Sequence, residues 1–443
     1  MSFTSSPTVA PWWRNRDLIL VAGGLGLSGL GNGIVATTLM LYMQAKGHSP
    51  WTVAGILAAD AIPLVLLSPL AGMLVDRLDS RRLIVAASLW QAACCVALAG
   101  TREIGLVFPL VVLLGAGTAL AGPTYSALLP RIVGEGRITR ASSITGTAVG
   151  IATIGAPAAG GLLYAASGLS GPFLIDAATF LVLAASIMAV RTRRAAAAAG
   201  DTKARARDGV SFVFTHPVLR SVMVMALSFV VVGEAVNVAD VYLVRDQLHR
   251  SATVYGLIGM LWAGSALVGS VLAGRFEGAH RSGRVIVISA FGLAGGLATV
   301  VLMPTLWFLV IAFAACGLCN GALNVCVSAL LLAVTPDAWR GRVTATFLGL
   351  VRTAGLGALA LGGVLAGTFA PATVFAICGV ASLIALALTA RPLLHVSDAR
   401  SVRSQPDIDT VPGDDWGGSR TDPVDDPPQS SIGPAVATPD RGR

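Results

Sequence analysis

The sequence predicts an all-α polytopic membrane protein with twelve membrane-spanning helices, and two observations carry this prediction. Hydrophobic residues make up 55% of the 443 residues and charged residues only 12%, about half the charged share of a soluble globular protein. The chain also divides into twelve apolar runs near the roughly 20 residues that a helix needs to cross a bilayer core. The 51 glycines fit close helix packing inside a bilayer.

Glycine, proline or charged residues separate each apolar run from the next. The expected spans are 18–42, 51–75, 82–100, 105–129, 140–167, 172–190, 219–244, 252–274, 284–303, 306–334, 343–368 and 372–391. Residues 1–17 are polar and precede a run that is too long for a signal-peptide core. We therefore expect no cleaved leader.

The distribution of arginine and lysine predicts the orientation. Alternate connections are rich in arginine, whereas the others hold only Lys46, Arg102, Arg245 and Arg250. Since basic residues concentrate in cytoplasmic loops, we expect both termini in the cytoplasm and the protein in the plasma (inner) membrane. The net charge of +8 has this topological explanation, and no nucleic-acid partner is expected.

Three segments recur at one offset of 202 residues. Leu70-Ala71-Gly72 matches Leu272-Ala273-Gly274, Ala127-Leu-Leu129 matches Ala329-Leu-Leu331, and Gly160-Gly161 matches Gly362-Gly363. The chain is therefore predicted to contain two copies of a six-helix unit. The expected parts are a cytoplasmic segment 1–17, a first bundle 18–190, a basic cytoplasmic linker 191–218, a second bundle 219–392 and a disordered cytoplasmic tail 393–443.

A charged motif interrupts the second predicted span. Gly72, Asp76, Arg77, Arg81 and Arg82 form a pattern that resembles the loop signature of the major facilitator superfamily. The resemblance implies two pseudo-symmetric six-helix bundles with substrate bound between them. It also implies that Asp76 meets the N-terminus of the eleventh helix and latches the cytoplasmic side. The alternative is that these charges only anchor the loop inside the cell.

The fifth span carries a glycine-rich motif. Gly150, Gly155, Pro157, Gly160 and Gly161 resemble the antiporter signature of exporters in that superfamily, although close helix packing alone would also use them.

Other stretches are similar to macrolide-efflux and enterobactin-exporter proteins among the proton-linked drug antiporters. They are Ala127–Val133, Phe173–Phe180, His216–Arg220, Tyr255–Leu257 and Arg340–Val343. The fourth span lacks the buried arginine that many of these antiporters use for proton coupling.

Ionisable residues inside a span are expensive and are candidates for function. Asp60 and Arg352 are expected at similar depths in spans two and eleven, where they are predicted to pair in one conformation and separate in another. Glu234, in span seven, is a second candidate proton carrier. A static ion pair and a structural hydrogen bond are the respective alternatives. Asp240 is expected at the outer rim, solvated or paired with Arg245, and Asp176 is expected at the start of the sixth span near the outer surface, where it caps or pins the helix.

Neutral polar residues occur near the middle of the spans expected to border the cavity. The candidate substrate contacts are Asn32, Thr37, Tyr125, Asn237, Asn320 and Asn324. A mainly apolar pocket with a few hydrogen-bonding groups suits an amphipathic organic molecule. Interhelical amide hydrogen bonds are the alternative role for each asparagine.

The resulting prediction is a monomeric secondary transporter that exports a small amphipathic compound in exchange for protons, with the lipid bilayer as its surroundings. The alternatives are a siderophore exporter, an importer of the same fold, or a membrane receptor or enzyme. All five histidines fall in loops or tails and the six cysteines lie in apolar runs. We therefore expect no metal site, no cofactor and small buried thiols.

Overall fold

The computed structural model describes residues 15–134, 138–190, 206–276, 278–336 and 339–395. Within these ranges the side chains of Ser68, Pro69, Gly72, Asp76, Thr139 and residues 206–209 are not described. The predicted linker up to residue 205 and the predicted tail beyond His395 therefore lie outside the described residues.

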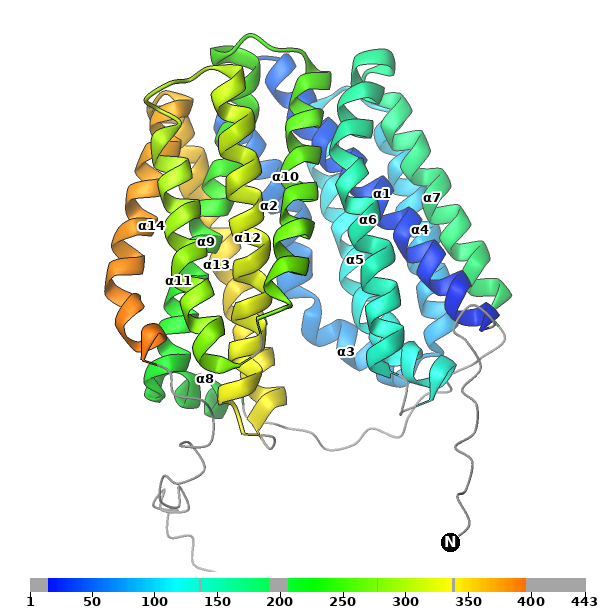
Figure 1. The fold of residues 1–443 in the computed structure, drawn as a ribbon. Helices are drawn as coiled ribbons and strands as arrows, with labels where there is room; N and C mark the ends of the chain where they lie inside the picture. Colours follow the sequence, from blue (N-terminus) through cyan, green and yellow to red (C-terminus); the bar gives the residue numbers. More distant parts are fainter. Residues whose placement is uncertain (1–14, 135–137, 191–205, 277, 337–338, 396–443) are drawn as a thin grey trace, which may run out of the picture. The chain divides into compact units, whose positions relative to one another are not determined.

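The described residues form helices joined by short connections (Figure 1). The helices are α1 (Arg16–Ala45), α2 (Pro50–Leu66), α3 (Ser68–Arg77), α4 (Ser80–Gly100), α5 (Ile104–Val133), α6 (Ile138–Ser167), α7 (Ser170–Ala189), α8 (Ala206–Thr215), α9 (Pro217–Tyr242), the π-helix η3 (Leu243–Gln247), α10 (Ala252–Ala273), α11 (Ala279–Thr299), α12 (Leu306–Val334), α13 (Arg340–Thr368) and α14 (Pro371–Leu394). Eleven spans in the described residues are long and apolar enough to cross a membrane, and η3 completes one of them.

The second predicted span, residues 51–75, is not one continuous helix. It is divided at Leu67 into the 17-residue α2 and the 10-residue α3. Pro69 lies in the first turn of α3, and because proline lacks an amide hydrogen it cannot make the backbone hydrogen bond that would continue α2. The equivalent position at the 202-residue offset is Val271, inside the unbroken α10.

The helix boundaries repeat along the chain. α5 begins at Ile104 and α12 at Leu306, and α6 begins at Ile138 and α13 at Arg340, each pair 202 residues apart. The left-handed residues Gly47 (φ 71°) and His249 (φ 51°) also lie 202 residues apart. This agreement supports the sequence repeat independently of residue identity.

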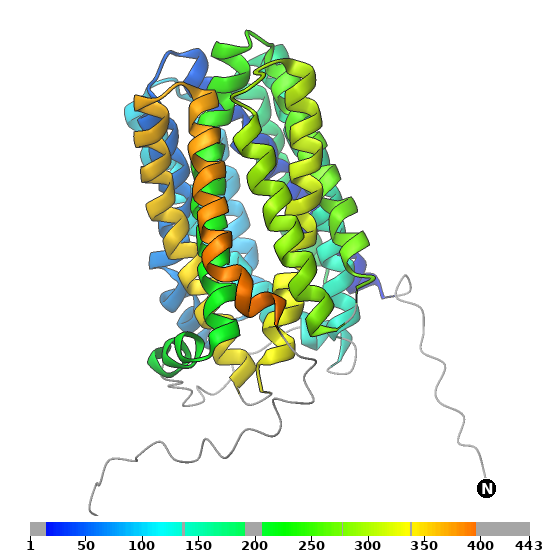
Figure 2. The ribbon, with the colours of Figure 1, turned by 60° about the vertical axis from the view of Figure 1, so that its left-hand side comes forward.

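The helix contacts repeat in the same order (Figures 1 and 2). α1 packs against α6 and α7, as α9 packs against α13 and α14. Likewise α4 contacts α5 and α7, as α11 contacts α12 and α14, and α2 contacts α5, as α10 contacts α12. The two sets meet where α2 contacts α13 and where α6 contacts α10. We propose on this basis that the predicted bundles are real structural units.

Glycines set how closely α1 approaches its neighbours. A Cβ atom at Gly24 would meet Leu183 of α7, one at Gly26 would meet Ala148 of α6, and one at Gly31 would collide with Asp176 of α7. Small residues allow this backbone approach in a membrane, where tight packing drives helix association. The rotation of α1 within its bundle is thereby fixed.

The short helix α8 packs against the beginning of α13. The Phe212 ring stacks on Trp339 with centroids 4.8 Å apart, and the Arg342 guanidinium lies 5.1 Å from the Trp339 ring. In Figure 2, α8 lies across the direction of the long helices. The end of the predicted linker is therefore helical and attached to α13.

Candidate functional site

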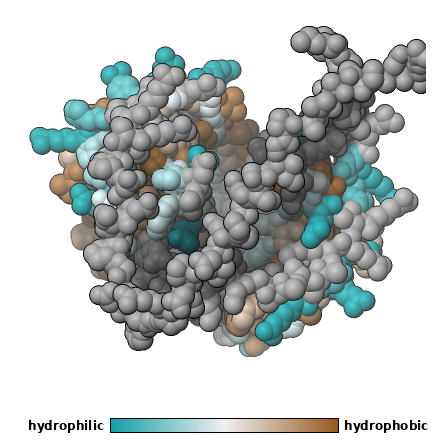
Figure 3. Space-filling view, turned by 90° about the horizontal axis from the view of Figure 1, so that it is seen from below, coloured by the Kyte–Doolittle hydropathy of each residue, from teal (hydrophilic) through white to brown (hydrophobic). Residues whose placement is uncertain are grey.

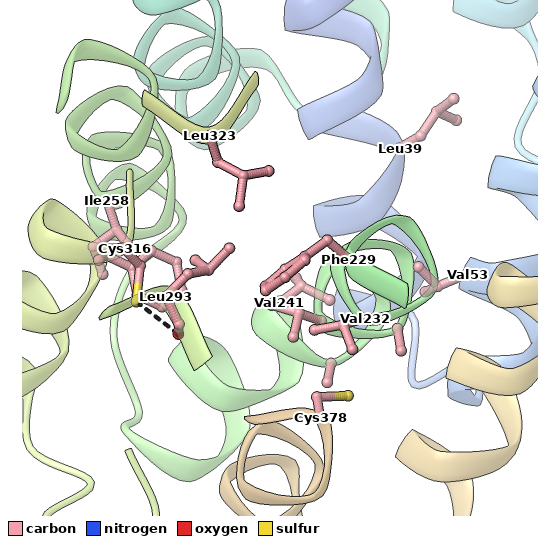
Figure 4. Close-up of a cluster of buried hydrophobic side chains, with 14 of the residues drawn as sticks. Leu39, Val53, Phe229, Val232, Val241, Ile258, Leu293, Cys316, Leu323 and Cys378 are labelled. Atoms are coloured by element: carbon pink, nitrogen blue, oxygen red, sulfur yellow. Dashed lines mark hydrogen bonds between the residues drawn. The ribbon is translucent and has the colours of Figure 1, made fainter. Parts of the chain in front are cut away.

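A cavity of about 520 Å³ lies at the junction of the two sets of helices. Its described walls come from α1 and α6 on one side and from α9 to α13 on the other. Figure 4 labels five of its apolar lining residues, namely Phe229 and Val232 of α9, Ile258 of α10, Leu293 of α11 and Leu323 of α12. Size and apolar lining match a site for a small organic molecule.

Four of the predicted cavity residues line this space: Thr37, Asn237, Asn320 and Asn324. Asn237 Nδ2 donates to Glu234 Oε2 at 3.4 Å, and Asn324 Nδ2 donates to Asn320 Oδ1 at 3.1 Å. Each amide bond stays within one helix, so neither is the interhelical bond considered from the sequence. Most of the polar lining belongs to α9 and α12, whereas α1 and α6 supply Thr37 and Thr153.

Two predicted cavity residues lie elsewhere. Asn32 is exposed on another part of α1, and it is not part of the cavity wall. Tyr125 of α5 also lies outside the wall, and its buried hydroxyl has no hydrogen-bond partner among the described residues. Depth along a helix was predicted for both, but the direction in which a helix faces depends on its packing.

Asp240 has a different environment from the expected one. It lines the cavity, and the Tyr255 hydroxyl of α10 donates to its Oδ1 at 3.1 Å. The same hydroxyl lies 3.5 Å from the Met40 sulfur of α1. Arg245 is directed away, since its guanidinium donates to Gln44 and to the carbonyl of Arg250. The predicted rim position and Arg245 partnership are therefore wrong.

Asp176 does not cap a helix, but its contacts agree with the other expected role, which was to pin one. It lies in the second turn of α7 and is fully buried. The Cys95 thiol donates to Oδ2 at 3.3 Å, the Thr179 hydroxyl donates to Oδ1 at 3.1 Å, and Gly31 packs against the carboxyl group. The helix begins at Ser170 instead, so the aspartate joins three helices inside one set.

Of the predicted proton-coupling residues, Glu234 lines the cavity, half-buried, with Asn237 as its partner. Asp60 and Arg352 are exposed on α2 and α13 and lie outside the wall of this cavity. The Asp60 backbone packs against Gly115 of α5. The structure does not bring Asp60 and Arg352 together among its described ion pairs, and their pairing in another conformation stays a prediction.

The charged residues of the motif lie at the end of α3 and in the first turn of α4. Asp76 and Arg77 form the end of α3, and the Asp76 side chain, with Gly72, falls outside the described part, so the latch stays a prediction. Arg81 donates to the carbonyl of Met188 in α7, and Arg77 and Arg82 are exposed. Asp79, between the two arginine groups of the motif, caps α4 by accepting from the Arg82 amide at 3.0 Å.

The glycine-rich motif of α6 is divided between two environments. Gly160 packs against Ile34 and Thr37 of α1, and Gly161 packs against Ala252 and Gly256 of α10. Pro157 also contacts Gly256 and Gly259 of α10. By contrast, a Cβ at Gly150 or Gly155 would meet no described atom within 4 Å. The second half of the motif therefore joins the two sets of helices.

Contacts between the two sets gather at the end of the molecule where α1 ends. Gln44 Nε2 donates to Asp246 Oδ1 at 2.6 Å, Arg245 Nε donates to Gln44 Oε1 at 3.1 Å, and the Tyr242 hydroxyl donates to the His48 carbonyl at 2.9 Å. Gly363 of α13 packs against Trp51 and Ala54 of α2 at the same end. This end is held shut by polar and apolar contacts together.

Hydrophilic residues gather around the rim of the opposite end, which Figure 3 shows from below. Exposed arginines occur there at helix ends and starts: Arg82, Arg131, Arg140, Arg220, Arg340 and Arg342. Basic residues concentrated at one end in this way predict the cytoplasmic side of a membrane protein.

The long apolar helices, their repeated contacts and the cavity between them define a multi-pass membrane transporter. The family model described as "Transmembrane secretion effector" matches residues 21–422, and the chain belongs to this family of the major facilitator superfamily. The predicted resemblance to that superfamily is confirmed.

Curated relatives include exporters. Macrolide efflux protein A of Streptococcus pyogenes is 22% identical over 307 residues, which cover 67% of this chain and 76% of the relative. The enterobactin exporter EntS of Shigella flexneri is 23% identical over 343 residues, which cover 74% and 82%.

A solved structure shares the fold. The inward-facing, unoccupied form of a bacterial homologue of the human lysosomal transporter Spinster superimposes with a TM-score of 0.68 and 16% identity. The match covers 86% of this chain and 98% of that one.

Proposed function

We propose that this protein is a plasma-membrane exporter of a small amphipathic organic compound, which it moves by alternating access in exchange for protons. The observation that carries the proposal is the cavity between the two sets of helices, closed at one end by Gln44, Asp246 and the α6–α10 contact. Efflux relatives support the direction of transport. Siderophore export and import by the same fold are the competing functions.

The proposed orientation places the arginine-rich end in the cytoplasm, with both termini inside. The structure then corresponds to a state closed to the outside. Opening would require the Gln44–Asp246 contact to break while the arginine-rich ends of the two bundles approach each other. Asp76 is the proposed latch of that second state, since a carboxylate near a helix N-terminus gains about 0.3–1 kcal/mol.

Protons supply the proposed driving force. One proton that moves into the cell while one substrate molecule leaves it contributes about 2.3 kcal/mol for each 100 mV of membrane potential. This free energy is enough for roughly a fiftyfold gradient of substrate. Asp60, Arg352 and Glu234 remain the proposed coupling residues. Glu234 faces the cavity directly, whereas Asp60 and Arg352 would act by pairing in one state and separating in the other.

The test is proton-driven transport in inside-out proteoliposomes that contain the purified protein, where export is measured as accumulation inside the vesicle, with a panel of macrolides and other amphipathic compounds as substrates. A compound that the protein moves should lose proton dependence in Asp60→Asn or Glu234→Gln. Full coupling in both variants removes this mechanism, and accumulation only in the opposite direction supports an importer. Glu103→Gln is the matched control, because Glu103 is an exposed acid at the start of α5 with no capping hydrogen bond.

A further inference from the structure

The charged residues described in the cavity wall are all acidic. Glu234 and Asp240 are both part of it, and the described lining residues include no lysine, arginine or histidine. Both acids belong to α9, six residues apart, which separates their backbones by about 9 Å along the helix. Two carboxyl groups therefore face one small, mainly apolar space.

The hydrogen-bond partners of these two acids are neutral. Tyr255 donates a hydroxyl to Asp240, and Asn237 donates an amide to Glu234. Arg245, the basic residue nearest in sequence, is held at the closed end by Gln44 and the Arg250 carbonyl. A carboxylate in an apolar site requires either a proton or a balancing positive charge, and the described wall contains no basic residue that could supply the charge.

Aromatic rings form much of the remaining wall. Phe229, Tyr255, Trp262, Phe313 and Phe347 come from four different helices, and the Trp262 and Phe313 rings meet edge to face with centroids 5.5 Å apart. The face of an aromatic ring attracts a cation, and this attraction grows when the cation is removed from water. The face of the same ring repels an anion.

We propose that the cavity selects organic cations, and that Asp240, held by Tyr255 where the two sets of helices meet, is the residue that binds the positive group of the substrate. Glu234 supplies a second negative charge six residues earlier on the same helix, about 9 Å along its axis. Thr37, Asn320 and Asn324 would bind the neutral polar groups of the same molecule. The inference rests on the proposed transport function and names the class of compound transported: amphipathic amines and quaternary ammonium or phosphonium ions.

The experiment compares two ions of nearly equal size and opposite charge. Tetraphenylphosphonium and tetraphenylborate are titrated separately, by calorimetry, into the full-length protein in nanodiscs, with empty nanodiscs subtracted. Tetraphenylphosphonium should bind at least about tenfold more tightly, which corresponds to about 1.4 kcal/mol. Equal binding of the two ions, tighter binding of the borate, or binding of neither overturns the inference.

Variants assign the effect to Asp240. Asp240→Asn should weaken phosphonium binding at least about tenfold, because it removes the charge and keeps the shape of the side chain. Asp240→Glu should retain binding within about threefold, and Glu103→Gln should bind like the unchanged protein. An Asp240→Asn protein that elutes and melts normally but binds phosphonium fully overturns the assignment. Should Asp240→Asn fail to fold, the assignment is judged from phosphonium binding by Asp240→Glu and from the difference in affinity between the two ions.

Equilibrium binding keeps this inference separate from the transport function. Selective phosphonium binding without efflux in vesicles would contradict the transport proposal and support the cavity assignment. If the protein instead exports neutral or anionic compounds and binds phosphonium no better than borate, the transport proposal is supported and the cavity assignment is contradicted.

Discussion

Gln44 and Asp246 lie 202 residues apart, at equivalent positions of the two repeats, and their side chains touch: Gln44 Nε2 donates to Asp246 Oδ1 at 2.6 Å. Two equivalent positions meet only where they lie beside the axis that relates the copies. The contact therefore marks the place where the two sets of helices close against each other.

Linking these two positions should stop transport. In a Gln44→Cys/Asp246→Cys double variant, a short bismethanethiosulfonate reagent should join the two sets and abolish efflux, because the closed end can no longer open. A reducing agent should restore efflux. The single variants are the controls, and the six native cysteines lie within helices, five of them buried. Unchanged efflux at complete cross-linking would show that this end does not open during transport.

The two environments of the α6 motif predict opposite responses to substitution. Gly161→Val should destabilise the protein by about 1–3 kcal/mol, since the new side chain would overlap the backbone of α10 at Ala252 and Gly256. Gly155→Ala should leave stability unchanged or raise it slightly, because its Cβ enters open space. Thermal unfolding in detergent measures both. Equal losses would mean that α6 does not join the two sets as described.

The contact of Gly31 with Asp176 should appear as energetic coupling. Gly31→Ala should cost about 1–3 kcal/mol of stability by overpacking against the carboxyl group. Because Asp176→Ala opens space there, the double variant should be more stable than the sum of the two changes predicts, by about 0.5–3 kcal/mol. Gly23→Ala is the matched control, since a Cβ at Gly23 meets no described atom within 4 Å. Strict additivity would contradict the packing.

His216 predicts a pH dependence of stability. Its Nδ1 accepts from the Leu219 amide at 3.5 Å and caps α9, and burial lowers the pKa of this histidine below its usual 6.5. A histidine with a lowered pKa contributes fully above the unfolded-state pKa, and this contribution is lost as the pH falls below about 6.5.

Melting temperatures measured from pH 8 to pH 5 should therefore fall more steeply for the unchanged protein than for His216→Asn. Asparagine is a good helix N-cap that does not titrate. The variant therefore keeps the cap, and its stability no longer depends on protonation at position 216. Parallel curves would exclude this role for His216.

The sequence predicted the helices well because length, hydropathy and proline are local properties. The predicted span 306–334 is α12 itself, and the span that starts at 372 is α14, which begins at Pro371. The break at Leu67 was missed, although Pro63 and Pro69 were visible, because the length of an apolar run does not show whether its helix is continuous.

The facing of side chains was predicted less well. Thr37, Glu234, Asn237, Asn320 and Asn324 do line the cavity, but Asn32 and Tyr125 do not, and Asp240 was placed at the rim. Depth follows from position along a helix, whereas facing depends on the rotation that packing imposes, as at Gly31 against Asp176. The spacing did indicate the side of α9 on which Asp240 lies, because Asp240 follows Asn237 by three residues and residues three apart share one side of a helix.

The interruption at Leu67 makes the two repeats mechanically unequal. α2 packs against α5 and α13, α3 packs against α5, and the two helices are joined at Leu67, which keeps a right-handed helical conformation but interrupts the regular helix. Its counterpart α10 runs from Ala252 to Ala273 without a joint. Bending during the transport cycle should therefore concentrate at this hinge in the first repeat, with the second repeat moving as a stiffer body.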